Sequence, residues 1–335
     1  MKKRAISLIS GGLDSAVATK LIIDQGIEVI GLHFTSIFAS KKDKERGLQA
    51  ARTAKELGIG MMTKNKGEDY MEVIKNPRYG YGKNMNPCID CRIFMLQLTK
   101  GLLSEVGASF VVTGEVLGQR PMSQRRNTIE LIEKRSGLEG LIVRPLSAKL
   151  FPPSIPEMEG IIDREKLLDV SGRSRQVQYQ FVETHRLSEF GLPGGGCLLT
   201  DPIFSIKFKD LIAHDSAYTT KDVELLTMGR HFRLSPSAKL VVGRNERENK
   251  QLASFRGDPY VLMDPVGFKG PQAVLKADVI DEAILETAGR IIARYGRDVP
   301  GTASIEVDNG LSTLSVSFAN KEIDSDALLV QQESS

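Results

Sequence analysis

The chain has 335 residues, of which 41% are hydrophobic and 26% charged, an ordinary composition for a globular protein of two domains. Its three cysteines are too few for a secreted disulfide framework. No apolar run reaches the roughly 18 residues that a membrane span needs, so we expect a cytoplasmic protein with no membrane partner.

The net charge of +3 is unevenly distributed. Residues 1–205 hold 29 Lys and Arg against 23 Asp and Glu, residues 206–277 hold 12 against 8, and residues 278–335 hold 4 against 11. This basic body is compatible with a polyanionic partner, although a solvated surface produces the same pattern.

The first third of the chain alternates short apolar runs with helix-like stretches. The predicted strands cover residues 5–9, 27–34 and 108–113, and the predicted helices cover residues 14–25, 44–57 and 89–106. This alternation predicts a parallel sheet with helices on its faces. Ligands of such sheets bind beyond the carboxyl ends of the strands.

From about residue 149 the pattern changes. Residues 150–156 form a proline-rich stiff connector, and residues 173–190 predict one long basic helix that carries aromatic side chains. After the glycine-rich segment 191–196, residues 205–276 are strand-like and basic, and residues 278–294 predict an amphipathic helix. We therefore predict a first domain at 1–205, a smaller mixed α+β domain at 206–300, and an acidic tail at 301–335.

A phosphate-binding loop is predicted between the first strand and the first helix. Its six residues are Ser10, Gly11, Gly12, Leu13, Asp14 and Ser15. Two glycines let the backbone approach a phosphate closely, and the start of the helix favours an anion. The hydroxyls of Ser10 and Ser15 can donate to phosphate oxygens. The loop lacks the lysine of a GxxxxGK[ST] motif, and an accidental Gly-Gly turn is the alternative.

The SGGLDS sequence resembles the signature of the PP-loop ATP pyrophosphatases. The resemblance implies an α/β fold, with a parallel-sheet PP-loop domain and a smaller mixed α+β C-terminal domain. It also implies that the loop binds ATP with Mg²⁺, and that Asp14 takes part in catalysis. Further nucleotide contacts are implied at His33 and Phe34, which end the second strand, and at Gly114, which follows the third. Core packing is the alternative for Phe34.

The cysteines form a second motif. Cys88 and Cys91 open the helix predicted from residue 89, and Cys197 follows the glycine run. Three chemistries are open from the residues alone: a redox dithiol, part of a zinc site, and an iron–sulfur cluster on three thiolates. Zinc is disfavoured because a structural site needs four ligands and none of the four histidines has zinc-ligand spacing.

The Asn86-Pro87 pair before these cysteines resembles the tRNA thiouridylases among the PP-loop enzymes. Cluster-independent members have aspartate where this chain has Cys88, whereas a CxxC with a distant third cysteine is similar to the cluster-dependent tRNA thiolases. The resemblance implies that Cys88, Cys91 and Cys197 bind a [4Fe–4S] cluster, with Cys91 and Cys197 also catalytic. A persulfide relay through Cys91 and Cys197 is the alternative.

The Gly243-Arg244-Asn245 segment resembles the NFACT-R domains, which are associated with RNA. Together the resemblances imply a ThiI-like, ATP-dependent tRNA sulfurtransferase that makes 2-thiouridine or 4-thiouridine. Its partners would be tRNA and a sulfur donor, either sulfide or a persulfide-carrying protein, and the oligomeric state is open, with a dimer allowed. The alternatives are adenylation of a small molecule and a non-catalytic RNA-binding module. Arginines that could neutralise phosphates are Arg125, Arg126, Arg144, Arg173 and Arg175.

Overall fold

The computed structural model describes residues 3–39, 41–191 and 197–331. The chain divides into two compact units, Met1–Thr200 and Asp201–Ser335. The first helix of the second unit is α8 (Pro202–His214), and the boundary expected near residue 205 falls inside it. The helix begins where it does because the Asp201 carboxylate accepts a hydrogen bond from the Phe204 amide (2.8 Å) and Pro202 fits the first turn.

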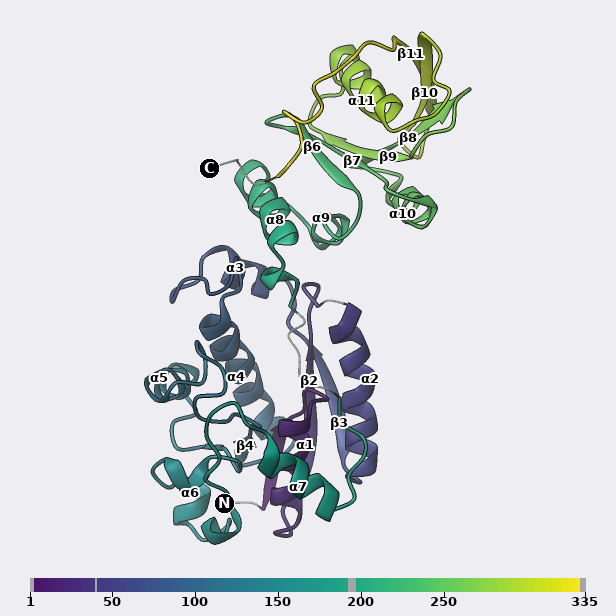
Figure 1. Ribbon diagram of the computed structural model, residues 1–335. Coiled ribbons are helices and arrows are strands. Elements are labelled where there is room, and N and C mark those ends of the chain that lie inside the picture. The colour runs from purple at the N-terminus through teal and green to yellow at the C-terminus, as the bar shows by residue number, and fades with distance from the viewer. Residues whose placement is uncertain (1–2, 40, 192–196, 332–335) are drawn as a thin grey trace. The chain divides into compact units, whose positions relative to one another are not determined.

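A parallel sheet organises the first unit, as the alternating pattern predicts (Figure 1). Within the described residues it has five strands in the order β3-β2-β1-β4-β5, and each pairing is parallel. The central strands are buried on both faces, which matches their continuous apolar sequences. The strands are β1 (Arg4–Leu8), β2 (Glu28–Thr35), β3 (Gly60–Asn65), β4 (Phe110–Val112) and β5 (Ile142–Val143).

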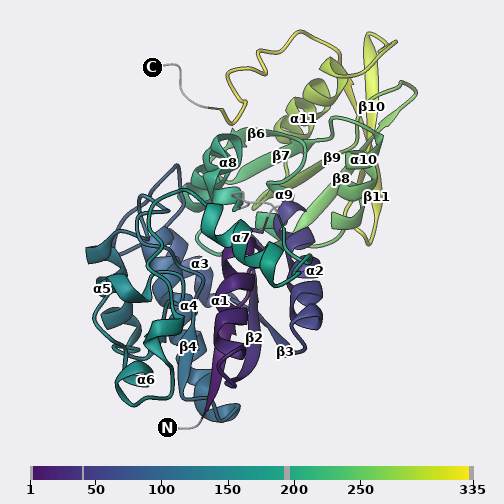
Figure 2. The same ribbon diagram turned by 60° about the horizontal axis from the view of Figure 1, so that its bottom comes forward.

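Helices cover both faces of this sheet (Figure 2). On one face, α1 and α7 pack over alternate residues such as Ala5 and Val29, and on the other α4 and α5 pack over residues such as Ile6 and Leu32. The helix α1 leads into β2 and α4 leads into β4, so each helix ends near the edge at which the parallel strands begin. Both helices therefore begin at the opposite, carboxyl edge of the sheet. The helices are α1 (Leu13–Ile23), α2 (Lys41–Glu56), α3 (Asp69–Lys75), α4 (Cys88–Glu105), α5 (Arg126–Ser136), α6 (Ile155–Met158) and α7 (Gln176–Thr184), with 3-10 turns η1 (Ala148–Leu150), η2 (Arg164–Lys166) and η3 (Leu198–Thr200).

Two segments of the first unit differ from expectation. The helix predicted over 173–190 is α7 alone, because the chain turns after His185, and Arg186 adopts a positive φ of 53°. The predicted connector at 150–156 is a packed part of the fold: it runs into α6, whose capping box joins Ser154 and Glu157 and whose Pro156 is buried.

An antiparallel sheet organises the second unit. In the described part of this unit it has six strands in the order β11-β10-β8-β9-β7-β6. The elements after α8 are α9 (Thr220–Leu225), β6 (Arg230–Ser235), β7 (Ala238–Val242), α10 (Glu246–Leu252), η4 (Ala253–Phe255), β8 (Tyr260–Val266), β9 (Ala273–Ala277), α11 (Glu282–Arg294), β10 (Thr302–Asp308) and β11 (Thr313–Ala319).

The core of the second unit lies between its sheet and α11, the helix that the sequence predicts from residue 278. Ile291 and Ile292 of α11 pack with Ile305 of β10 and Phe318 of β11. Both strands lie in the segment expected as an acidic tail, so this part of the chain completes the folded unit. The inward residues of β10 alternate with polar ones, as in a half-buried strand.

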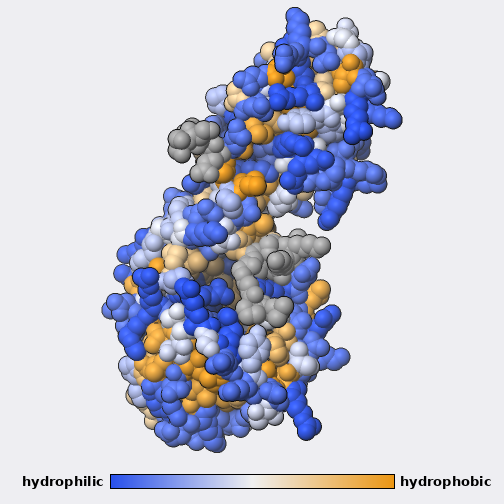
Figure 3. Space-filling view, in the orientation of Figure 1, coloured by the Kyte–Doolittle hydropathy of each residue, from blue (hydrophilic) through white to orange (hydrophobic). Residues whose placement is uncertain are grey.

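On the face shown in Figure 3, each unit presents mainly hydrophilic side chains with hydrophobic ones scattered among them. No helix in the described ranges combines the length and the hydrophobicity that a membrane crossing requires.

Candidate active site

The predicted phosphate loop lies between β1 and α1 and is held by its own hydroxyls. Gly11 has φ of +74°, and a Cβ there would lie 2.6 Å from the Arg46 carbonyl of α2, so the turn requires glycine. The Ser15 hydroxyl donates to the Gly12 carbonyl (2.8 Å) and lies 3.2 Å from the Ser10 hydroxyl. Leu13 is buried in the core, so only its backbone faces the loop. Among the described residues, no side chain caps α1 at Gly12, which leaves first-turn amides for an anion.

Asp14 is held by the helix α7. Its carboxylate accepts a hydrogen bond from Gln178 Nε2 (3.1 Å) and pairs with Arg175 Nη2 (3.3 Å). Arg175, expected among the arginines that neutralise phosphates, therefore neutralises this carboxylate in the structure. Gln178 was missed by sequence reasoning, and its amide oxygen is buried without a hydrogen-bond partner in the described structure.

The turn after β4 lies against the phosphate loop. A Cβ on Gly114 would come within 2.7 Å of the Asp14 carbonyl and the Ser15 amide, so only glycine allows this approach. The structure thus places Gly114 beside the loop. Because Gly114 packs directly on the backbone of Asp14 and Ser15, the turn after β4 and the first turn of α1 cannot shift independently of each other.

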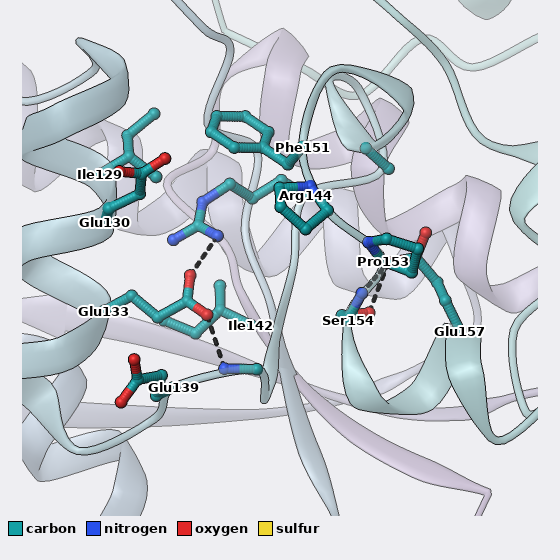
Figure 4. A pocket seen from close by; sticks show the side chains of 13 residues that line it. Ile129, Glu130, Glu133, Glu139, Ile142, Arg144, Phe151, Pro153, Ser154 and Glu157 are labelled. Atoms are coloured by element: carbon teal, nitrogen blue, oxygen red, sulfur yellow. Dashed lines mark hydrogen bonds and ion pairs between the residues drawn. The ribbon is translucent and has the colours of Figure 1, made fainter.

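Glu115, the next residue, is the centre of a buried ion-pair network. Its carboxylate accepts hydrogen bonds from Arg92 Nε (2.8 Å) and Arg144 Nε (3.1 Å). Burial by itself would raise the pKa of Glu115, but the charges and hydrogen bonds of the two arginines outweigh it and lower the pKa to about 2. Arg144 also pairs with Glu133 (2.6 Å), at the edge of a cavity of about 300 Å³ (Figure 4). Arg144 is therefore a structural ion-pair partner, not an exposed phosphate ligand.

His33 and Phe34, expected beside the adenine, use their side chains in packing. His33 is buried, and its Nδ1 donates to the Ile9 carbonyl (2.9 Å). Its ring faces Gly47 of α2, where a Cβ would lie 3.3 Å from Nε2. Phe34 packs against the core cluster beneath α4. A nucleotide at this strand end would therefore meet mainly backbone.

The three cysteines come from two separate segments, and none of them forms a disulfide in the structure, which describes all three. Cys88 and Cys91 lie in the first turn of α4. Cys197 lies just before η3, where its backbone forms an isolated antiparallel β-bridge with Ala39. The Cys88 sulfur accepts a hydrogen bond from Asn86 Nδ2 (3.0 Å). Burial and the neighbouring Cys91 raise the pKa of Cys88. The glycine run before Cys197 lies at 192–196, outside the described residues.

One buried tyrosine, Tyr70 of α3, lies within electrostatic range of all three thiols. Burial is the largest cause that raises the pKa of Tyr70, and the charges of Cys91, Cys197 and Cys88 raise it further, together with a hydrogen bond to Cys91. The three cysteines therefore lie in the same region of the first unit. In the described part of the chain, no group of three or more His, Cys, Asp or Glu side chains has the arrangement to hold a metal ion.

Lys66 and Tyr70 were missed by the sequence analysis. The Lys66 ammonium lies 3.1 Å from the Cys91 sulfur and 4.2 Å from the centre of the Tyr70 ring. No motif marks either residue: Lys66 follows β3, and Tyr70 lies in the first turn of the short helix α3. Only the fold brings them to α4.

Arg120, an exposed residue, lies between the cysteines and the phosphate loop in electrostatic range. Partial removal from water lowers the pKa of Arg120 most, and the nearby guanidiniums of Arg92 and Arg46 lower it further. Cys88 and Asp14 act in the opposite direction and raise it, so Arg120 lies within electrostatic range of both the thiol and the phosphate loop. Arg120 belongs to the polar segment that follows the β4 turn.

Two family models match separate parts of the chain. The model for thiamine biosynthesis protein (ThiI) matches residues 1–149, and the model for the NFACT protein RNA binding domain matches residues 229–325. The chain is 28% identical over 144 residues to a probable tRNA sulfurtransferase of Methanothermobacter thermautotrophicus, covering 43% of this chain and 36% of that protein. It is 34% identical over 210 residues to the tRNA-specific 2-thiouridylase MnmA of Flavobacterium johnsoniae, covering 56% of this chain and 53% of that protein.

Among solved structures, a 4-thiouridine synthetase in complex with RNA and bound ATP is 22% identical, with a TM-score of 0.36, over 54% of this chain and 50% of that chain. The chain thus spans about a third to a half of the length of these relatives. The two family matches fall on the two compact units, the first on the parallel sheet and the second on the antiparallel one. Residues 1–149 are therefore similar to the ThiI family and residues 229–325 to the NFACT protein RNA binding domain, in agreement with the two motifs in the sequence.

Proposed function

We propose that this protein is an ATP-dependent tRNA sulfurtransferase of the cytoplasm. The observation that carries the proposal is that α1, with its phosphate loop, and α4, with Cys88 and Cys91, both begin at the carboxyl edge of one parallel sheet. This is the edge at which such sheets bind their ligands. The curated relatives named above, which are tRNA sulfurtransferases and thiouridylases, support the same activity.

The loop side would bind ATP with Mg²⁺. The α1 amides, the Ser10 hydroxyl and the Gly11 backbone would bind the β- and γ-phosphates, and Asp14 would hold magnesium once released from Arg175. A uridine carbonyl oxygen attacks the α-phosphorus, and diphosphate leaves. The oxygen is then attached to AMP, which is a far better leaving group than the original carbonyl oxygen.

The thiol side would supply sulfur. An anionic sulfur attacks the activated carbon of the base, AMP departs with the oxygen, and the base carries sulfur in its place. Cys88, Cys91 and Cys197 would hold a [4Fe–4S] cluster, which when bound supplies an iron with an open position for a sulfur ligand. Thiolates are the ligands that such a cluster requires, but the described side chains are not arranged to hold a metal ion in this structure, so the cluster rests on the residue types alone. The persulfide relay through Cys91 and Cys197 uses the same residues.

The C-terminal domain would hold the tRNA. Its NFACT-R match and the basic composition of residues 206–277 support contact with RNA phosphates. The target base must leave its stack to reach the loop and the thiols, as for other enzymes that act on a base. The sulfur donor would be sulfide or a persulfide-carrying protein.

The test uses the anaerobically reconstituted full chain, unmodified tRNA, ATP, Mg²⁺ and labelled sulfide. We expect labelled sulfur in tRNA, and nucleoside mass spectrometry then distinguishes 2-thiouridine from 4-thiouridine. Asp14→Asn should abolish labelling, whereas Asp24→Asn, at the exposed far end of α1, should not. Release of AMP with no sulfur in tRNA would instead favour adenylation of a small molecule, and binding of tRNA without AMP release would favour an RNA-binding module.

A further inference from the structure

The two edges of the antiparallel sheet in the second unit differ. At the β6 edge, the C-terminal segment of the same chain adds a further pairing. The Arg233 amide donates to the Leu328 carbonyl (2.8 Å). The Val330 amide donates to the His231 carbonyl (2.8 Å). At the opposite edge, β11 lies beyond β10 (Figure 1), and no described segment pairs with its outer side.

The hydrogen bonds near both ends of β11 show which of its backbone groups face the open edge. The Asn320 amide donates to the Gly301 carbonyl (2.9 Å). The Asn309 amide donates to the Ser312 carbonyl (3.3 Å). Both pairs continue the register of β10 with β11, so the even-numbered residues of β11 direct their N–H and C=O groups to β10. The residues that direct theirs to the open edge are therefore Thr313, Ser315, Ser317 and Ala319.

The open strand has none of the features that protect exposed edges. Natural edge strands carry lysine, proline or a β-bulge, which prevent pairing with another chain. Residues 309–320 contain no charged residue and no proline, and the register of β11 with β10 is regular throughout. Two large apolar side chains are exposed here, Leu311 at 95% and Leu314 at 59%. The sequence of this edge therefore favours pairing with another strand.

The strand is complementary to a second copy of itself. Val316 is the middle residue of Thr313–Ala319, so an antiparallel pairing centred on it aligns all seven residues of both copies. In this register Ser315 lies opposite Ser317 of the second copy, and both direct their backbone groups across the edge. On the face that packs on α11, the exposed Leu314 lies opposite Phe318 of the second copy, which extends the apolar core across the contact.

The charges of the neighbouring strand are compatible with this pairing. The carboxylates of β10, Glu306 and Asp308, lie opposite Ser315 and Thr313. Two copies of β11 would separate the carboxylates of one β10 from those of the other by three strand spacings, about 14 Å. This distance exceeds the Debye length of about 8 Å at physiological salt, so their repulsion is largely screened.

We propose that β11 pairs antiparallel with β11 of a second copy, forming a homodimer in which one sheet continues through both second units. The strand supplies seven residues per partner, fewer than the roughly 20–30 of a standard interface. The dimer should therefore dissociate at micromolar concentrations. This inference goes beyond the proposed sulfurtransferase activity and does not depend on it.

The first experiment is analytical ultracentrifugation of the full chain across the micromolar range. The dimer fraction of the parent should rise with concentration. Ser315→Pro removes an N–H that faces the second copy and leaves the hydrogen bonds to β10 intact. Because the residue occurs twice in the dimer, the dissociation constant should rise at least about tenfold. Ser315→Thr keeps the N–H and should match the parent, and circular dichroism checks that both variants are folded.

The second experiment tests the register by cross-linking. The two copies of Val316 would meet as a non-hydrogen-bonded pair, with Cα atoms about 4.5 Å apart, a separation that a disulfide accepts. Val316→Cys should therefore link two copies under mild oxidation, with the linked peptides identified by mass spectrometry. Leu314→Cys is the control. Its side chain is more exposed, but its two copies would lie about 13 Å apart and should not be linked.

A parent chain that stays monomeric across the whole range would overturn the inference. A Ser315→Pro dimer that dissociates like the parent would overturn it as well, because the contact would then lie elsewhere. If Ser315→Pro does not fold, the cross-link decides: linkage through Val316→Cys alone supports the pairing. Equal linkage of Val316→Cys and Leu314→Cys would indicate random collision and contradict it.

Discussion

The phosphate loop and the cysteine site start from the same sheet edge but are built in different ways. The loop is made by six consecutive residues, and its contacts among Ser10, Gly12 and Ser15 are local. The cysteine site draws Lys66 and Tyr70, the start of α4, and Cys197 from separate parts of the first unit. The comparison teaches that substitutions at the loop edge should act on folding, whereas substitutions among the thiols should act on sulfur chemistry and leave folding nearly unchanged.

The largest expected effect lies beside the loop, at Glu115. Glu115→Ala leaves the buried Arg144 and the half-buried Arg92 without their shared carboxylate, so we expect the first unit to lose about 3–5 kcal/mol of unfolding free energy. Urea denaturation measures this loss, with Glu130→Ala on the exposed side of α5 as the control. If Glu115→Ala lowered the unfolding free energy by less than about 1 kcal/mol, the loop edge would not differ from the cysteine site in its importance for folding.

The same carboxylate makes the stability of the first unit depend on pH. The pKa of Glu115 is about 2 when folded against 4.5 for the free side chain. Its contribution is therefore complete above pH 4.5 and declines as the pH falls toward about 2, because the unfolded chain takes up the proton first. Urea midpoints measured across this interval should fall more steeply for the parent than for Glu115→Ala. Parallel curves would contradict the assignment.

Gly114→Ala should have an intermediate effect. Its Cβ would lie 2.7 Å from the backbone of Asp14 and Ser15, which cannot move without shifting the start of α1. We expect a loss of about 1–3 kcal/mol and weaker nucleotide binding, measured by urea denaturation and by calorimetry with ATP. Gly60→Ala, where a Cβ meets nothing within 4 Å, is the control. Equal behaviour of the two variants would show that the turn and the loop are not coupled.

The smallest effect on folding is expected at the thiols. Cys88→Ser keeps an acceptor for the Asn86 amide in a half-buried position, so the unfolding free energy should change by less than about 1 kcal/mol. Iron bound after anaerobic reconstitution should nevertheless fall sharply, because one of the three proposed ligands is lost. A large loss of stability with normal iron content would assign Cys88 to the fold and would reverse the comparison.

Much of the architecture could be predicted because its signals are local. Apolar runs of strand length alternate with helical periodicity, and glycines end the first helices, which led to the parallel sheet. Strands β10 and β11 were assigned to a tail because the acidic composition of the segment obscured the alternation of Ala303, Ile305 and Val307. Arg144 and Arg175 were expected as phosphate ligands because a sequence shows a charge without its partner; their partners, Glu115 and Asp14, are supplied by the fold.

What the sequence by itself determined is the chemistry available: a glycine loop at a strand end, a CxxC at a helix start, and a distant third cysteine. These features depend on backbone conformation and spacing within a few residues, so they can be identified without tertiary structure. Only the tertiary structure decided which side chains face them, namely Gln178 at Asp14 and Lys66 with Tyr70 at Cys91. The physical reason is that the order of strands in the parallel sheet brings chain segments far apart in sequence to one edge, where charge and burial select the partners.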